Sequence, residues 1–358
     1  MPKNIVVLAD GTGQLGRETV NTNIYNLFNM LEDRTPRQIV FYEPGIGTGR
    51  ERLITQGTGL GISEKITECY KFIFENYEAG DLIYLLGFSR GSTTVRSLSN
   101  FIHHFGILPA SRPDLIQQAY YMYQENNEAK LKEDATEFIG KNHTMWVRIH
   151  FIGCFDTVAA LGLPGWKRFL NFFPFFRYEY QDLALPDSVV HAVHALSIDD
   201  KRKAFHPTLW QSQIRDYQTL IQVWFCGCHS DVGGGYQDQR LAGIPLVWML
   251  QNAVKYGLLI YPGNKVEIKE DPNGTMHDPR DSWWAKLIFQ VQERTWDTSR
   301  SDRPIIHESV LKRFKNPQNG LVPEYSPWIL KLEPAVEPWV KLEKQTWYRT
   351  MKKNRAKE

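Results

Sequence analysis

Residues 81–100 read DLIYLLGFSRGSTTVRSLSN, and they decide the fold. The stretch opens with an apolar run, turns through GFSRG (87–91) and continues with a pattern typical of a helix. A short apolar run bounded by turn residues indicates a buried strand. The serine between two glycines has two interpretations. Either a tight turn needs small residues, or the turn presents the hydroxyl of Ser89 as a nucleophile.

The segments on both sides of this stretch repeat the alternation of strand and helix. Strands are predicted within residues 4–10, 37–49, 81–91, 145–158 and 219–236. Helices are predicted within residues 22–33, 61–77, 92–106, 108–143, 187–199 and 244–258, and no strand is expected from about residue 259 onward. This order is typical of an α/β fold with a doubly wound, mostly parallel sheet.

The same pattern predicts one domain over residues 1–350. Its sheet core would span about 4–258, and the part rich in Trp and Pro, 259–350, would pack on that core or form a cap. Residues 351–358 are expected to be a disordered tail.

Composition limits the classes of partner. The 358 residues carry 42 Lys and Arg against 40 Asp and Glu, a net charge of +2, which gives no argument for nucleic acid. Four cysteines without metal-binding or redox spacing favour a reducing compartment. There is neither a signal-peptide pattern nor a membrane-spanning apolar run, so we expect a cytoplasmic protein, with export open only to a signal-independent secretion system.

The five predicted strands all end in polar residues, namely Asp10, Glu43, Ser89, Asp156 and the pair His229 and Asp231. In an open parallel sheet, ligands bind at the carboxyl ends of the strands. These side chains are therefore expected to meet at one rim.

A serine nucleophile needs a base, and the base needs an acid to orient it. His229 is the expected base because it follows a strand and precedes a run of three glycines, and His307 is the competing candidate. Asp156 is the expected acid, because it ends the predicted strand that directly precedes the strand of His229. Asp231 is the alternate acid. The order Ser89, Asp156, His229 is the order of α/β-hydrolases.

An oxyanion hole needs two backbone N–H groups. One is expected from Arg90, the residue after the nucleophile, and the other from Gly11 or Thr12 in the loop after the first strand. Asp10 would brace that loop or serve as a metal ligand. Gly87 and Gly91 would let the elbow approach its neighbours closely, because they lack Cβ atoms.

The motifs together resemble one family. They are LADGTGQ, YEPGIGTG, GFSRGSTTVRSL, CFDTVAALG, HALSIDDKRKAFHP, CGCHSDVGGGY and IHESV, spread over most of residues 4–313. The family was first described as a domain of unknown function (DUF2235), and its better-known members are Tle1-like phospholipase effectors of type VI secretion. The resemblance implies an α/β-hydrolase fold and cleavage of phospholipid acyl esters. It also implies a triad of Ser89, Asp156 and His229.

The sequence thus favours a serine esterase or lipase that needs no metal or other cofactor. Its expected partners are an ester or phospholipid substrate and, transiently, a membrane surface; its oligomeric state is undetermined. The aromatic segments 163–180 and 283–296 could be a lid or core. Two alternatives stay open. One is a metal-dependent phosphohydrolase using Asp10, Asp156, His229 and Asp231, and the other is a non-catalytic binding protein on a hydrolase fold.

Overall fold

The computed structural model describes residues 2–11, 20–45, 60–125, 127–158, 184–281, 286, 289–315 and 325–341. Within them lies one sheet in the order β2-β1-β3-β4-β5-β6-β7-β8, with every neighbouring pair parallel. The strands are β1 Asn4–Ala9, β2 Gln38–Glu43, β3 Leu82–Phe88, β4 Ile149–Phe155, β5 Val189–Ser197, β6 Thr219–Phe225, β7 Ile305–His307 and β8 Ala335–Glu337. The predicted α/β fold with a doubly wound, mostly parallel sheet is confirmed.

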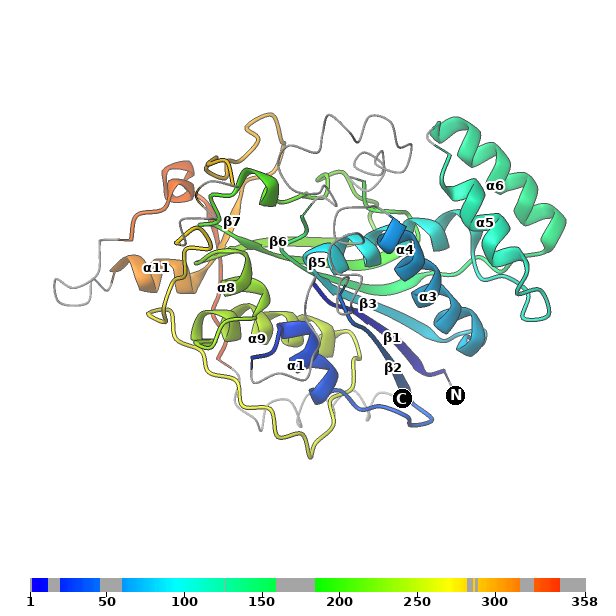
Figure 1. Ribbon diagram of the computed structural model, residues 1–358, viewed down its shortest axis with the longest axis horizontal. Helices are drawn as coiled ribbons and strands as arrows, with labels where there is room; N and C mark the ends of the chain where they lie inside the picture. Colours follow the sequence, from blue (N-terminus) through cyan, green and yellow to red (C-terminus); the bar gives the residue numbers. More distant parts are fainter. Residues whose placement is uncertain are drawn as a thin grey trace.

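Helices cover both faces of the sheet (Figure 1). They are α1 Asn23–Met30, α3 Leu60–Asn76, α4 Arg90–Phe105, α5 Leu115–Tyr123, α6 Glu128–Asn142, α8 His229–Gly233, α9 Arg240–Lys255 and α11 Glu308–Lys315, with 3-10 turns η2 Lys203–Phe205 and η3 Trp328–Leu332. No helix in these described ranges is long and apolar enough to cross a membrane.

Strand β1 shows why the apolar runs are continuous rather than alternating. Ile5 and Val7 join the core that contains residues of α3 and α4, whereas Val6 and Leu8 join the opposite core with residues of α1 and α9. Successive strand side chains point to opposite faces. A strand covered on both faces therefore needs an apolar residue at every position.

The strand order reverses between β1 and β3. From β1 the chain crosses to β2 on one side, then returns past β1 to β3 and continues to β8. In open α/β sheets the crevice for a ligand forms at the carboxyl ends of the strands at such a reversal. Here those ends carry Gly11 and Ser89, so the topology alone points to this position.

The helix predicted over 187–199 is wrong, because these residues form β5. This strand lies between β4 and β6 and pairs with both along its length. Its sequence VVHAVHALS fits a helix as well as a strand, and pairing on both edges decides the outcome. As a result His191 and His194 lie on opposite faces of the sheet. The ring of His191 stacks on that of Tyr256 with centroids 3.6 Å apart, and the ring centroid of His194 lies 5.5 Å from that of Trp210.

Two further expectations fail for related reasons. Strand β5 separates the β4 and β6 ends, so Asp156 does not end the strand directly before that of His229. Residues beyond 259 also contain strands, β7 and β8, each of three residues. Such short strands leave no periodic pattern in the sequence. Strand β7 pairs with the open edge of β6, and β8 pairs in turn with the edge of β7.

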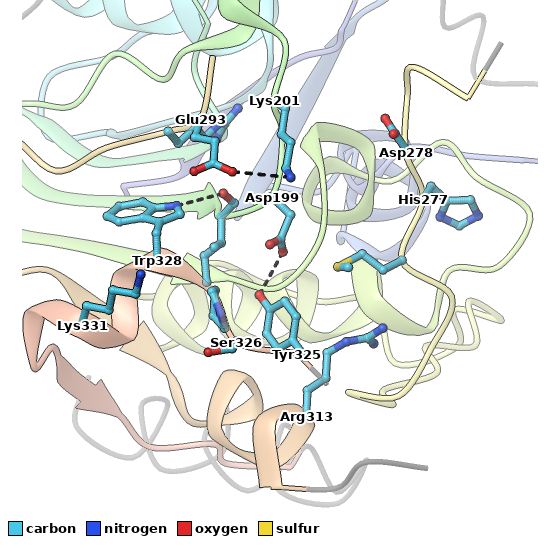
Figure 2. Close-up of a pocket in the computed structure, with 14 residues that line it drawn as sticks. Asp199, Lys201, His277, Asp278, Glu293, Arg313, Tyr325, Ser326, Trp328 and Lys331 are labelled. Atoms are coloured by element: carbon cyan, nitrogen blue, oxygen red, sulfur yellow. Dashed lines mark hydrogen bonds and ion pairs between the residues drawn. The ribbon is translucent and has the colours of Figure 1, made fainter. Parts of the chain in front are cut away.

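A cleft of about 530 Å³ opens near the carboxyl ends of β5 and β6. It lies between the loop after β5, which carries Asp199 and Lys201, and the C-terminal elements α11 and η3 (Figure 2). Tyr325 donates a hydrogen bond to Asp199 at 2.9 Å, and Lys201 pairs with Glu293 at 3.5 Å. The residues around the cleft include Arg294 but not Ser89 or His229.

Helix α4 lies so close to β1 that its second residue has no room for a side chain. A Cβ atom at Gly91 would overlap the backbone carbonyl of Ala9. We therefore expect Gly91→Ala to lower the free energy of unfolding by about 2 kcal/mol or more, because the helix must shift off the sheet. Urea unfolding measures this.

Gly140→Ala is the matched control, because nothing lies within 4 Å of a Cβ at that position in α6. Alanine should stabilise this helix by about 0.5–1 kcal/mol relative to glycine. If Gly91→Ala were as stable as the wild type, the close approach of α4 to β1 would be wrong.

Candidate active site

The turn between β3 and α4 holds Ser89 in a strained backbone conformation, with φ 58° and ψ −121°. A non-glycine residue in such a region costs about 1–3 kcal/mol, and such strain clusters at functional sites. The turn is fixed by the N–H of Ser89, which donates to the carbonyl of Phe155 at 3.0 Å. A Cβ at Gly87 would lie 2.5 Å from the carbonyl oxygen of Gly91. Both glycines of the GFSRG segment are therefore required by close contacts.

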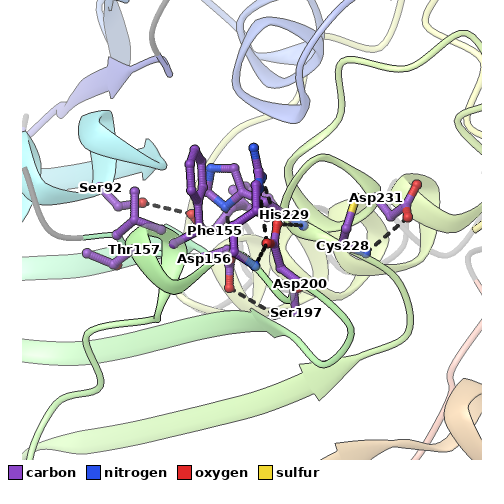
Figure 3. A network of polar contacts seen from close by, with 12 residues as sticks. Ser92, Phe155, Asp156, Thr157, Ser197, Asp200, Cys228, His229 and Asp231 are labelled. Carbon is purple, nitrogen blue, oxygen red and sulfur yellow. Dashed lines mark hydrogen bonds and ion pairs between the residues drawn. The ribbon is translucent and has the colours of Figure 1, made fainter. Parts of the chain in front are cut away.

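Asp156 and His229 meet although 73 residues separate them. Asp156 follows β4 with φ 40°, and His229 begins α8 after β6. The Nδ1 atom of His229 lies 2.6 Å from Oδ2 of Asp156, and both side chains are buried (Figure 3). This contact orients the imidazole with Nδ1 toward the carboxylate, which leaves Nε2 for another partner.

The imidazole of His229 lies beside the Ser89 turn. Its ring centroid is 4.7 Å from that of Phe88, the residue before Ser89, and 5.0 Å from that of Phe205. Gly233, the last residue of α8, serves this packing, because a Cβ at this position would overlap the ring of Phe88. The structure thus brings the predicted base, acid and nucleophile turn to one edge of the sheet.

Arg294 also binds the carboxylate of Asp156, and no sequence pattern predicted this role. Its guanidinium contacts Asp156 at both oxygens, Nη1 to Oδ1 at 2.6 Å and Nη2 to Oδ2 at 2.8 Å. Its side chain is fully buried. The local sequence gives no signal for this role, because Arg294 directly follows another charged residue, Glu293, whose side chain is exposed.

Burial and charge together set the protonation of this pair. Burial alone would raise the pKa of Asp156, but the Arg294 guanidinium and His229 outweigh it and hold the pKa well below its usual range. Burial lowers the pKa of His229 below its usual value, although Asp156 opposes this. The favoured state is therefore an ionised carboxylate beside a neutral imidazole, which is the resting state a general base requires.

Asp10 braces the end of β1. Its carboxylate accepts hydrogen bonds from the hydroxyls of Thr22 at 2.6 Å and Tyr42 at 2.7 Å, and from the N–H of Gly11 at 2.6 Å. Burial nevertheless raises the pKa of Asp10 to about 6 against these hydrogen bonds. These contacts tie the start of the loop after β1 to α1 and β2.

The candidate oxyanion donors lie around Ser89. A Cβ at Gly11 would be 3.4 Å from the Cβ of Ser89, so the backbone of Gly11 is adjacent to the serine. Its N–H, however, already donates to Asp10. Arg90 is the first residue of α4, whose N-terminal end carries a partial positive charge. Thr12 lies outside the described residues.

The alternate acid and base have other partners. Asp231 accepts hydrogen bonds from the N–H of Cys228 at 3.0 Å, and its Oδ1 lies 2.6 Å from Nδ1 of His277. Nδ1 of His307 lies 2.9 Å from the hydroxyl of Ser309, and burial lowers the pKa of His307 to about 4. The structure therefore joins neither residue to the pair of Asp156 and His229.

The four residues considered for a metal belong to three separate networks. Asp10 binds Thr22 and Tyr42, Asp231 binds His277, and Asp156 is occupied by Arg294 and His229. In the part of the chain that the structure describes, no three His, Cys, Asp or Glu side chains gather closely enough to hold a metal ion. Among the described contacts, only Asp156 and His229 of these four residues bind each other.

Most residues of the two aromatic segments considered for a lid lie outside the residues that the structure describes. Residues 163–180 lie outside the described residues, as do residues 283–285 and 287–288, and the tail 351–358. Within the described part, Phe289 packs against Phe205 with ring centroids 5.9 Å apart. This segment therefore contacts the residues around His229.

Comparison with known proteins identifies the family. A sequence model of the family described as T6SS, Phospholipase effector Tle1-like, catalytic domain matches residues 3–252. The chain belongs to this family. The match includes the nucleophile turn, Asp156 and His229, but it ends before Arg294.

Two proteins similar to this Tle1-like chain share less than a third of its sequence over the matched regions. The uncharacterized protein YEL023C of Saccharomyces cerevisiae is 28% identical over 233 residues, covering 57% of this chain and 32% of that protein. An uncharacterized protein from Pseudomonas aeruginosa has a solved structure with a TM-score of 0.47 and 17% identity, covering 75% of this chain and 48% of that one.

A second solved structure is the Tle1 effector bound to the VgrG spike of the type 6 secretion system. Its TM-score is 0.35 at 19% identity, covering 66% of this chain and 52% of that one. The chain thus spans about a third of the curated relative and about half of each solved chain. Likenesses this distant support no conclusion about function.

The buried ion pair predicts a large effect of Asp156→Asn on stability. The substitution leaves the guanidinium of Arg294 buried without its carboxylate, so the free energy of unfolding should fall by about 3 kcal/mol or more. Because the folded-state pKa of Asp156 is depressed, this stabilisation is present above the unfolded pKa near 4. The difference between wild type and variant should shrink as the pH falls below about 4.

Asp302→Asn is the control for this measurement. Asp302 pairs with Arg300 at 2.8 Å but is partly exposed, so its loss should cost about 1 kcal/mol or less. Equal effects of the two substitutions across the pH range would contradict the role given to burial.

Proposed function

We propose that this Tle1-like chain is a serine hydrolase that cleaves acyl esters of phospholipids through an acyl-enzyme on Ser89. The observation that carries the proposal is the buried contact between Asp156 and His229 beside the strained turn of Ser89. Family membership supports the lipid substrate class, because the family is described by its phospholipase effectors.

In this mechanism His229 is the general base. Its Nδ1–H donates to Asp156, so Nε2 accepts the proton as the Oγ of Ser89 attacks the ester carbonyl carbon. The acyl C–O bond then breaks, and the imidazolium returns the proton to the leaving alkoxide. Water, deprotonated by the same imidazole, attacks the acyl-enzyme, and the proton passes back to Ser89 as the fatty acid leaves.

The oxyanion of each tetrahedral intermediate would be bound by the N–H of Arg90 and by a second N–H from the loop after β1. Gly11 lies beside Ser89 but donates to Asp10, which favours Thr12 as the second donor. The partial positive charge at the start of α4 supports the same anion. No metal ion takes part in any of these steps.

A long-chain phospholipid reaches such a site from a membrane surface. We therefore infer a transient contact with lipid bilayers during turnover, with the phospholipid as the substrate partner. A short soluble ester would be a weaker substrate, because it lacks the apolar area that a lipid acyl chain contributes to binding.

Ser89→Ala is expected to reduce turnover of a labelled phospholipid and of p-nitrophenyl esters at least about 10³-fold, because it removes the nucleophile. Turnover by the wild type should be unaffected by a chelator. The ratio of the two substrates measures the preference for lipid.

Ser99→Ala is the control, since Ser99 lies in the same helix α4 and its buried hydroxyl donates only to the carbonyl of Arg96 in the bonds described. It should retain wild-type turnover. Activity that survives Ser89→Ala, or that a chelator abolishes, would favour the metal-dependent alternative. A folded wild type with no turnover of any ester would favour a binding protein.

A further inference from the structure

Arg294 is held in place from several sides. Besides the two contacts with Asp156, its Nη1 donates to the carbonyl of Ser197 and its Nη2 to the carbonyl of Phe205, both at 2.6 Å. Those carbonyls come from the end of β5 and from η2. A guanidinium bound in this way has little freedom to rotate, so it fixes the plane of the carboxylate it contacts.

The chain segment before Arg294 is itself anchored. The N–H of Gln292 donates to the carbonyl of Lys201 at 2.9 Å, and the N–H of Lys203 donates to the carbonyl of Gln290 at 2.9 Å. This short antiparallel pairing aligns residues 290–292 with the loop after β5. The guanidinium thereby reaches Asp156 from a part of the chain that lies beyond the family match at 3–252.

Both carboxylate oxygens of Asp156 have two hydrogen-bond partners each. Its Oδ1 accepts from the N–H of Ser197 at 2.9 Å and from Arg294, while Oδ2 contacts His229 and Arg294. A lone carboxylate beside an imidazole strongly favours the imidazolium. A carboxylate paired with a guanidinium attracts the imidazolium less, because the pair has no net charge.

We propose that Arg294 is a positioning residue of the site: it fixes the carboxylate of Asp156 and offsets its charge, so that His229 remains a neutral base in mildly acidic solution. This inference rests on the proposed function of Ser89, Asp156 and His229. The expected consequence is a hydrolase whose activity extends below the pH at which an ordinary histidine becomes protonated.

The other charges around His229 follow the same pattern. Its backbone N–H donates to Asp200 at 3.2 Å, and Asp200 is paired with Arg202 at 2.7 Å. Each of the two carboxylates that hydrogen-bond to His229 therefore has its own guanidinium, Arg294 for Asp156 and Arg202 for Asp200. Asp231, two residues further along α8, pairs instead with His277. The remaining neighbours described at the ring, Phe88 and Phe205, carry no charge. Burial keeps the pKa of His229 below its usual value, in agreement with this arrangement.

The first test compares the pH dependence of kcat/KM in Arg294→Met and the wild type. Removing the guanidinium leaves the charge of Asp156 to stabilise the imidazolium, so the acidic limb should move up by about one pH unit or more. Arg294→Lys keeps the charge but loses the two-point contact. It should keep the limb near its wild-type position while kcat falls.

Arg300→Met is the matched control. Arg300 also contacts an aspartate at two atoms, Asp302, and a backbone carbonyl, that of Trp210, but it lies away from His229 in the described contacts. Its profile should superimpose on the wild type. A limb of Arg294→Met that also superimposes, or a wild-type kcat in Arg294→Lys, would overturn the proposal. If Arg294→Met fails to fold, Arg294→Lys still decides whether the two-point contact matters.

The cleft beside Arg294 allows a second test by chemical rescue. Arg294 is among the residues around this cleft of about 530 Å³, and Arg294→Ala leaves a space next to the cleft where its buried guanidinium lay. Millimolar guanidinium should raise the turnover of Arg294→Ala at least several-fold, whereas sodium at equal ionic strength should not. Equal effects of the two cations would count against a specific role of the guanidinium.

A third readout separates this inference from the proposed function. NMR titration of His229 in Ser89→Ala protein, with and without Arg294→Met, reports the pKa of the imidazole without any turnover. The pKa of His229 should rise on loss of Arg294 even if no ester is ever cleaved. An unchanged pKa would overturn the inference while leaving the hydrolase proposal intact, and absent turnover in the wild type would do the reverse.

Discussion

The site depends on the close approach of helix α4 to the sheet. The second residue of this helix touches the carbonyl of Ala9, so it can only be glycine, and Gly87 is confined in the same way. Between these two glycines Ser89 takes a positive φ, and its N–H donates to the carbonyl of Phe155. The packing of a helix on two strands is thus the reason that the serine sits at the rim of the sheet.

The ends of three neighbouring strands, β4, β5 and β6, hold the residues around Ser89 in place. The end of β4 accepts the N–H of Ser89 at Phe155 and, one residue later, places Asp156 with its own positive φ of 40°. The end of β6 delivers His229, and β5 between them contributes Ser197. Ser89 and Asp156 keep strained backbone conformations because the well-packed parallel sheet fixes the ends of β3 and β4.

The buried charges are balanced in pairs around the imidazole. A carboxylate in a dry interior is costly alone, and each of the two beside His229 is matched by an arginine. One of these arginines comes from residues near the carboxyl end of β5, and the other from a segment almost a hundred residues further on. The C-terminal part of the chain therefore belongs to the electrostatics of the site as well as to the edge of the sheet.

The sequence by itself determined the alternation of strands and helices, the strand–turn–helix around Ser89 and the residue types at the strand ends. These are local properties, written in apolar runs and glycines within about twenty residues. Only the tertiary structure decided that residues 189–197 form a strand, because pairing on both edges outweighs an ambiguous pattern. The sequence favoured His229 over His307 as the base, but only the structure shows its contact with Asp156. The structure alone brought Arg294 to this pair. Contacts between distant segments depend on how the whole sheet assembles, and no short stretch of sequence encodes that.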